Sequence, residues 1–335
     1  MSSSTVRVAA VGLVLCAAVA SMIESGLCGC EPRYPAPRLK VEPAPSVVST
    51  TPETIEQAPM TCPQELTATR RGGTDPDRYV APSPDAAAAI RSAIAALVTA
   101  GGTREAAARA ASGAGYEIID INHAPGLVLV REHEDARHGG GAYLVRLGSR
   151  SDLILQAPHT FFDQGTLELG WAFFQHSKAR ALFINTAHRY RAAAQKPDGT
   201  NPADVAHASD SMFHAATLGA LEDPRIRFIV QLHGFGQRES AAAAVVSTGE
   251  DLRGGAFLGR VARALDASLA ARVQRFPDDT SELGATTNVQ GEAVRAAGRR
   301  FLHIEMSGET RTRLVNDQPL ATTVFQSLLL AIEPG

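Results

Sequence analysis

Residues 153–170 read LILQAPHTFFDQGTLELG and contain a strand, a turn and the first part of a helix. Residues 153–156 form a short apolar run that is typical of a buried strand, and residues 166–177 have the apolar spacing of a helix. The alternation continues downstream, with strands expected at 181–185, 228–232, 243–247 and 301–304 and helices at 211–222, 256–273 and 318–332. Strands that alternate with helices form a sheet covered on both faces. The pattern predicts an α/β fold, one three-layer αβα domain with a mostly parallel or mixed sheet.

The segment before this stretch is expected to add two helices and three strands. Ala-rich residues 85–100 and 103–111 have helical spacing, with Ser83 and Thr103 as N-cap residues and Pro84 at the first helical position. Short apolar runs follow at 116–121, 127–130 and 142–147. Because short connections join these runs, we expect them to form an antiparallel lead-in to the sheet.

The first 30 residues have the pattern of an export signal. Residues 8–23 are an apolar run of 16 residues, which is short for a membrane span and typical of a signal h-region. Leu27-Cys28-Gly29-Cys30 resembles a bacterial lipobox, in which Cys30 would carry the lipid and begin the mature chain. An ordinary cleaved signal or an uncleaved anchor are the alternatives. We expect an exported protein of the bacterial cell envelope that contacts the membrane only through this anchor or signal.

A proline-rich linker is expected over residues 31–80, followed by a single domain over residues 81–335. Residues 31–65 carry eight of the 19 prolines, and proline prevents regular structure. The four cysteines are too few for a disulfide scaffold. Cys62 is either a lone thiol or half of a bridge to an unlipidated Cys30.

Composition narrows the class of protein. The chain of 335 residues has 44% hydrophobic and 20% charged residues, which is typical of a soluble domain with a core. Its net charge of −3 offers no basic field for a polyanion, and 5% aromatic residues leave few platforms for base stacking. We therefore expect no nucleic-acid partner.

Polar side chains follow four of the expected strands. They are His159 and Asp163 after 153–156, Arg189 after 181–185, His233 after 228–232 and Glu305 after 301–304. Binding sites of such sheets form at the carboxyl ends of the strands. A zinc hydrolase needs a set of this kind: nitrogen or oxygen ligands, a carboxylate that takes a proton from water, and a cation that steadies negative charge.

Each of these residues also has an ordinary interpretation. His159 would be a turn histidine, and Asp163 would cap the helix that begins near Gly165. His303 lies on the same strand face as Glu305, where it either orients that residue or only packs. Arg311 and Arg313 are further candidate cations, and each by itself is expected to be a solvated surface charge. The histidines His176, His188, His207 and His214 are expected to be ordinary histidines.

The motifs resemble the poly-γ-glutamate hydrolase group of the zinc carboxypeptidase-like and N-formylglutamate amidohydrolase-like superfamily. The matching segments, over roughly residues 150 to 310, are Ala157-Pro158-His159 with Asp163 and Gly165-Thr166, then Leu232-His233-Gly234, then His303-Ile304-Glu305. The resemblance implies a zinc carboxypeptidase-like fold with zinc on His159, Asp163 and His233, and Glu305 as the base that activates water. The chain departs from the group at Asp163, where the group more often has Glu.

The expected function is a zinc-dependent amidohydrolase or carboxypeptidase-like peptidase. Small peptides or cell-wall-type amides, such as γ-glutamyl, peptidoglycan-type or N-acyl amino acid compounds, are the expected substrates, with Arg189 binding their carboxylate. A serine hydrolase is disfavoured because the chain lacks a Gly-x-Ser-x-Gly elbow. A non-catalytic lipoprotein module on the same scaffold remains the alternative.

Overall fold

The computed structural model describes residues 61–75, 79–192, 195–196, 199–236, 242–253 and 255–332. The expected signal, the lipobox with Cys30 and the linker up to residue 60 lie outside these residues. Within the described part, Cys62 is a free thiol. Among the helices described there, none combines the length and the apolar composition needed to cross a membrane.

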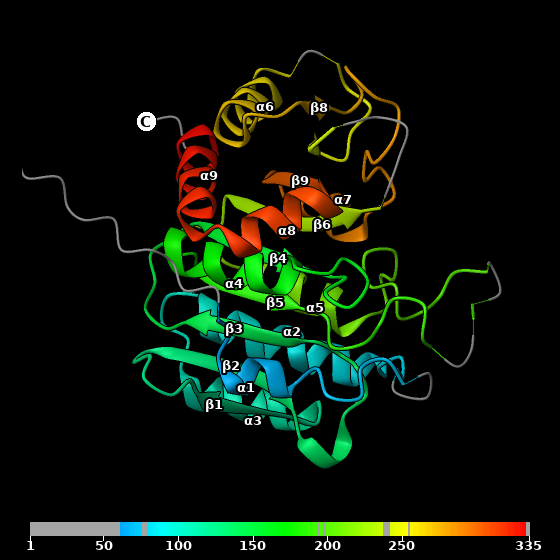
Figure 1. The fold of residues 1–335 in the computed structure, drawn as a ribbon. Coiled ribbons are helices and arrows are strands. Elements are labelled where there is room, and N and C mark those ends of the chain that lie inside the picture. Colours follow the sequence, from blue (N-terminus) through cyan, green and yellow to red (C-terminus); the bar gives the residue numbers. More distant parts are fainter. Residues whose placement is uncertain are drawn as a thin grey trace, which may run out of the picture. The chain divides into compact units, whose positions relative to one another are not determined.

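One mixed sheet runs through the described residues (Figure 1), with nine strands in the order β1-β2-β3-β5-β4-β6-β9-β7-β8. The strands are β1 Tyr116–Asp120, β2 Leu127–Glu132, β3 Ala142–Arg146, β4 Leu153–Ala157, β5 Ala181–Ile184, β6 Phe228–Phe235, β7 Ala244–Ser247, β8 Val273–Arg275 and β9 Arg300–Ser307. The central strands β5, β4, β6 and β9 are parallel to one another. The lead-in strands β1, β2 and β3 pair antiparallel, as the sequence predicts.

Helices cover both faces of the sheet. They are α1 Gln64–Ala68, α2 Pro84–Val98, α3 Arg104–Gly113, α4 Thr166–Ser177, α5 Met212–Leu221, α6 Ala256–Leu269, α7 Val289–Ala296, α8 Gly308–Asn316 and α9 Gln318–Ile332, with a short 3-10 turn at Glu134–Ala136. One core lies under α1, α4, α6, α8 and α9, and the other lies under α2, α3, α5 and α7. The three-layer α/β fold class is therefore confirmed.

The strand sequences explain why there are two cores. Along β4, Leu153 and Leu155 enter the α4 side, whereas Ile154 enters the α5 side. Successive side chains of a strand point to opposite faces, so a strand covered on both sides is apolar at every position. On the α5 side this apolar pattern stops at Gln156 in β4 and Gln231 in β6, which are both fully buried.

Several elements differ from the sequence-based expectation. The helix expected over 256–273 ends at Leu269, because Ala270 takes a left-handed conformation (φ 50°) and the chain returns as β8. Helices α7 and α8 were not expected. In α8 only Thr310, Arg311 and Leu314 are buried, so the helix has too few apolar positions for a clear periodic signal.

The domain begins earlier than expected. Helix α1 lies inside the predicted linker, and its Leu66 has no exposed surface. Tyr79 is 7% exposed and belongs to the opposite core. The predicted boundary at residue 81 is therefore wrong, because burial of these side chains joins the end of the predicted linker to the domain.

The strand order leaves a crevice at the carboxyl end of β4. Strand β4 lies between β5 and β6, and the connecting helices α4 and α5 lie on opposite faces of the sheet. The chain therefore leaves β4 through α4 over one face of the sheet and leaves β5 through α5 over the other face. Ligands of such sheets bind in the crevice that this divergence opens at the carboxyl ends of the strands. Strands β6 and β9 add His233 and Glu305 side by side as register partners.

Candidate metal centre

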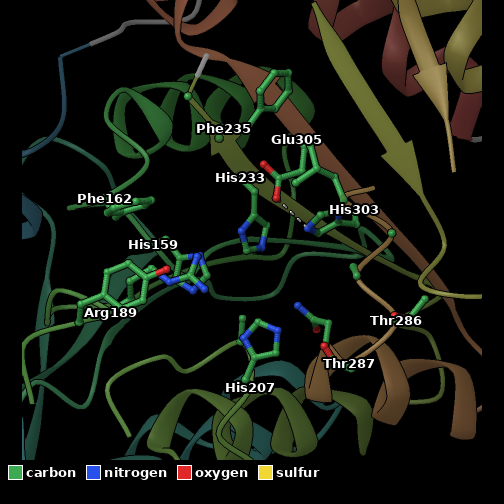
Figure 2. A pocket seen from close by; sticks show the side chains of 18 residues that line it. His159, Phe162, Arg189, His207, His233, Phe235, Thr286, Thr287, His303 and Glu305 are labelled. Atoms are coloured by element: carbon green, nitrogen blue, oxygen red, sulfur yellow. Dashed lines mark hydrogen bonds and ion pairs between the residues drawn. The ribbon is translucent and has the colours of Figure 1, made fainter. Parts of the chain in front are cut away.

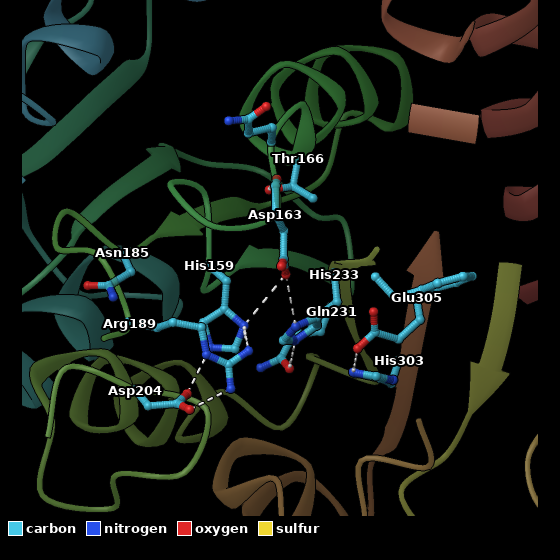
Figure 3. A network of polar contacts seen from close by, with 12 residues as sticks. His159, Asp163, Thr166, Asn185, Arg189, Asp204, Gln231, His233, His303 and Glu305 are labelled. Carbon is cyan, nitrogen blue, oxygen red and sulfur yellow. Dashed lines mark hydrogen bonds and ion pairs between the residues drawn. The ribbon is translucent and has the colours of Figure 1, made fainter. Parts of the chain in front are cut away.

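The three ligands predicted from the sequence converge at this crevice. Asp163 Oδ2 lies 3.6 Å from His159 Nδ1 and 3.5 Å from His233 Nδ1 (Figure 3). The donor atoms of the three residues all lie within 4.8 Å of one another. Each residue is at most 3% exposed. The separations suit three ligands of one metal ion.

Asp163 is positioned by the turn between β4 and α4, and it does not cap the helix. Its backbone N–H donates to the carbonyl of His159 at 2.8 Å, and the hydroxyl of Thr166 donates to its carbonyl at 2.7 Å. The N-cap position is Gly165, at a φ of 88° that suits glycine. The capping interpretation of Asp163 is therefore wrong, and its side chain remains available for the site.

The Asp163 carboxylate fits a cation. Neither of its oxygens accepts a hydrogen bond from the described residues, although both are buried. Burial raises the pKa of Asp163, but His159 and His233 lower it more, so the pKa lies well below its usual range. A buried ionised carboxylate costs several kcal/mol unless positive charge or donors compensate it. Two imidazoles and a carboxylate are a typical zinc ligand set.

Hydrogen bonds on the far side of each imidazole orient the ligand nitrogens. His159 Nε2 lies 2.9 Å from Asp204 Oδ1, and His233 Nε2 lies 3.0 Å from Gln231 Oε1. Both partners are acceptors, because the Gln231 oxygen also receives the Nδ2–H of Asn288 at 2.8 Å. Each Nε2 therefore carries a proton, which leaves Nδ1, the nitrogen nearer Asp163, as the one that a neutral ring can offer to a metal.

Gln231 belongs to a buried chain of amides beneath the site. Its Nε2 donates to Gln156 Oε1 at 2.8 Å, and Gln156 Nε2 in turn donates to Thr217 of α5 at 2.9 Å. Gln290 of α7 accepts a longer bond from Gln231 at 3.3 Å. These bonds prevent the Gln231 amide from reversing, because a reversal would place donor against donor.

Sequence reasoning missed both orienting residues. Gln231 precedes His233 by two positions on the same strand face, so strand periodicity was a usable signal for it. Asp204 lies in the loop before α5, where no periodicity marks it. Its other oxygen contacts Arg189 Nη2 at 2.5 Å and His207 Nδ1 at 3.3 Å.

Arg189 lies at the site, where its guanidinium already contacts Asp204 and His159. Besides Asp204, its Nη1 lies 3.1 Å from His159 Nδ1, the nitrogen expected to bind metal. A metal on that nitrogen would displace this contact and release one arm of the guanidinium. Its predicted role towards a substrate carboxylate stays a prediction.

Glu305 and His303 complete the crevice from β9. Glu305 is 8% exposed, and its Oε1 lies 3.6 Å from His303 Nε2. His303 packs against His233, with ring centroids 4.5 Å apart, and these two histidines with Glu305 form a second group spaced for a metal. Burial lowers the pKa of His233 to about 4 and that of His303 well below 6.5, so both rings are neutral at neutral pH.

The site opens into a cavity of about 740 Å³ (Figure 2). Besides His159, His233, His303, Glu305 and Arg189, its wall includes Phe162, Tyr190, Ala206, His207, Phe235, Leu283, Ala285, Thr286, Thr287 and Asn288. Glu305 thus faces the same space as the metal-ligand candidates, as a base towards bound water must.

The alternative cations have other roles. Arg311 is 8% exposed and donates from Nε to the carbonyl of Gln164 at 2.7 Å and from Nη1 to that of Met306. It therefore ties the loop beside Asp163 to the end of β9. Arg313 donates to the carbonyl of Leu269, away from the cavity. Of the histidines expected to be ordinary, only His207 lines the cavity; His176, His188 and His214 do not.

No protein-family model matches the chain, and no curated protein matches it in sequence. Three of the solved structures that are similar to this chain, each at probability 1.00, are described next. Bacteriophage poly-gamma-glutamate hydrolase has 16% identity over 59% of this chain and 89% of that chain, with a TM-score of 0.38. A putative carboxypeptidase A from Shewanella denitrificans OS-217 has 12% identity over 62% and 64%, with a TM-score of 0.38. N-formylglutamate amidohydrolase from Ralstonia eutropha JMP134 has 14% identity over 58% and 97%, with a TM-score of 0.36.

Proposed function

We propose that this chain is a zinc-dependent hydrolase of amide bonds, with the metal held by His159, Asp163 and His233. One observation carries the proposal. The buried Asp163 carboxylate, which accepts no hydrogen bond from the described residues, lies between two imidazoles whose lone pairs face it. A divalent cation balances the carboxylate charge and uses both lone pairs.

Zinc in such a site supplies Lewis-acid chemistry, which polarises the amide carbonyl and makes water a nucleophile near neutral pH. Glu305 accepts the proton of the attacking water and returns it to the amide nitrogen as the C–N bond breaks. The products are a carboxylic acid and an amine, and Glu305 ends the cycle ionised. Asp204 and Gln231 hold the imidazoles in the required tautomer throughout.

The proposed substrates are small amides that carry a carboxylate: γ-glutamyl, peptidoglycan-type or N-acyl amino acid compounds. The sequence resemblance and the place of Arg189 in the cavity wall support this class. With a metal on His159 Nδ1, the Nη1 arm of Arg189 would be free to donate to such a carboxylate while Nη2 stays on Asp204.

The test separates metal binding from catalysis. We expect wild-type protein to purify with one zinc per chain and His159→Ala and His233→Ala to lose it, because two ligands hold zinc weakly. Glu305→Gln should keep the zinc and lose about 10²- to 10⁴-fold in amide hydrolysis. His176→Ala, at the far end of α4, is the matched control and should retain both.

Two outcomes contradict the proposal. Full zinc content in either histidine variant shows that the ligand set is wrong. A zinc-loaded wild-type protein that cleaves no compound of the proposed class favours the non-catalytic module on the same scaffold.

We also propose that the protein is exported and lipid-anchored through Cys30. The apolar run at residues 8–23 and the Leu27-Cys28-Gly29-Cys30 motif support this. In a bacterial host the mature chain should begin at Cys30 with added diacylglycerol, as measured by mass spectrometry of the N-terminal peptide. The Cys30→Ala variant should no longer be found in the membrane fraction, whereas the Cys62→Ala variant should still be found there. An unmodified N-terminus on membrane-bound protein would refute lipidation.

A further inference from the structure

Two exposed aromatic side chains lie at the cavity. Phe162 is 49% exposed and Tyr190 is 53% exposed, and both line the cavity wall. The other large apolar side chains that are exposed in the described part of the chain are Val80, Leu252 and Leu330, and none of them lines it. Large apolar surface that collects at a cavity indicates a binding surface.

The two rings are held in a defined arrangement. Their centroids lie 5.2 Å apart with an interplanar angle of 88°, an edge-to-face pair. The guanidinium of Arg189 lies 4.9 Å from the Tyr190 centroid and 5.8 Å from the Phe162 centroid. Arg189 is anchored to Asp204, so the two rings and the guanidinium form one cluster beside the site.

The backbone links this pair to the metal centre. Phe162 directly precedes Asp163, and its N–H donates to the carbonyl of His159 at 2.9 Å. Tyr190 directly follows Arg189, and its N–H donates to His188 Nδ1 at 3.2 Å. The pair therefore shares the cavity wall with His159 and His233, and Figure 2 shows Phe162 beside His159.

We propose that Phe162 and Tyr190 form an aromatic subsite that binds an aromatic side chain of the amide substrate. The proposal rests on the hydrolase function proposed above and names its preferred substrate class. His188 already packs edge-to-face against Phe162, with ring centroids 5.9 Å apart, and Arg189 lies over the Tyr190 ring, but about half of each ring stays exposed to meet a further ring. Each added aromatic contact favours binding beyond its buried area. Ala206, Leu283 and Ala285 add small apolar patches to a cavity wall that is otherwise mostly polar, so the two exposed rings are where an aromatic group would bind.

Binding without turnover tests the subsite. In the zinc-loaded Glu305→Gln protein, we expect the amide N-acetyl-phenylalanine to bind about tenfold more tightly than the amide N-acetyl-alanine in calorimetry, close to the value of one aromatic contact. Phe162→Ala and Tyr190→Ala should each reduce this ratio towards one, and Phe162→Tyr should restore it. Leu330→Ala, which removes an exposed apolar side chain on α9, is the control and should leave the ratio unchanged.

Three results overturn the subsite. They are equal binding of both amides, a ratio that survives the double alanine variant, and tighter binding of N-acetylglucosamine than of the phenyl amide. Zinc content measured on each variant checks that the metal centre is intact; loss of zinc in both alanine variants would assign the rings a structural role. A phenyl preference in a wild-type protein that hydrolyses no amide would leave the subsite standing and refute the hydrolase.

Discussion

The carboxylate of Asp163 is the side chain whose surroundings point most directly to a metal. Its oxygens are buried and accept no hydrogen bond from the described residues, and its neighbours are two imidazoles. An uncompensated charge of this kind is expensive, so a group that binds there stabilises the folded chain. The aspartate in place of the longer glutamate is accommodated because the turn from His159 brings its backbone close to the crevice.

Gln231 offers a test of ligand orientation at the same scale. Replacing it by leucine removes the acceptor for the Nε2–H of His233, so we expect zinc affinity to fall about 10- to 100-fold. Competition with a chelator of known affinity measures the change. Gln231→Glu retains an acceptor and should lose less.

The control for this prediction is Gln175→Leu, an amide on α4 that bonds Arg146 away from the cavity. Equal zinc affinity in wild type and Gln231→Leu would show that the amide chain does not orient His233.

At the scale of elements, the amino ends of the strands are held together by a buried ion pair. Arg180, just before β5, contacts Asp223, just after α5, at 2.6 Å, with side chains 1% and 2% exposed. Arg180 also donates to the carbonyls of Val98 at the end of α2 and Ser151 before β4. One guanidinium thus links four segments at the edge opposite the metal centre.

Asp223→Asn should destabilise the domain by about 3 to 5 kcal/mol at pH 7, because it leaves the Arg180 charge buried without its partner. Burial raises the pKa of Asp223, but Arg225 and Arg180 lower it more, so the pKa lies below its ordinary value. The stabilisation is therefore present above about pH 4 and is lost as the pH falls through the lowered folded-state pKa. Urea unfolding at pH 7 and pH 3 measures it.

The difference between wild type and Asp223→Asn should shrink at the lower pH. Asp120→Asn, whose partner Arg104 is exposed, is the matched control and should unfold at nearly the same urea concentration as wild type. A gap between wild type and Asp223→Asn that is constant with pH would contradict the linkage argument.

At the scale of the whole molecule, the folded domain includes part of the expected linker. Leu66, a residue of α1, is fully buried, and burying a leucine contributes about 1.5 to 3 kcal/mol to stability. Tyr79 enters the other core, so the segment contacts both sides of the sheet.

A chain that begins at residue 61 should therefore unfold at the same denaturant concentration as the mature protein. A chain that begins at residue 81 should lose several kcal/mol, because it exposes the apolar surface that Leu66 and Tyr79 cover. Leu66→Ala in the longer chain should cost about 2 to 5 kcal/mol. Equal stability of the two truncated chains would show that this segment does not pack as described.

The sequence by itself determined the layered α/β architecture, the capped helices α2 and α3, and the strands near whose carboxyl ends His159, His233 and Glu305 lie, although β6 and β9 run three residues beyond the expected ends and include His233 and Glu305. These features depend on periodicity and on neighbours along the chain, which one sequence contains in full. Tertiary structure alone decided that Asp204 orients His159, that α1 packs on the domain and that Phe162 meets Tyr190. Each of these contacts joins segments without regular spacing, so its partner is set by how the sheet and its loops bring distant residues together.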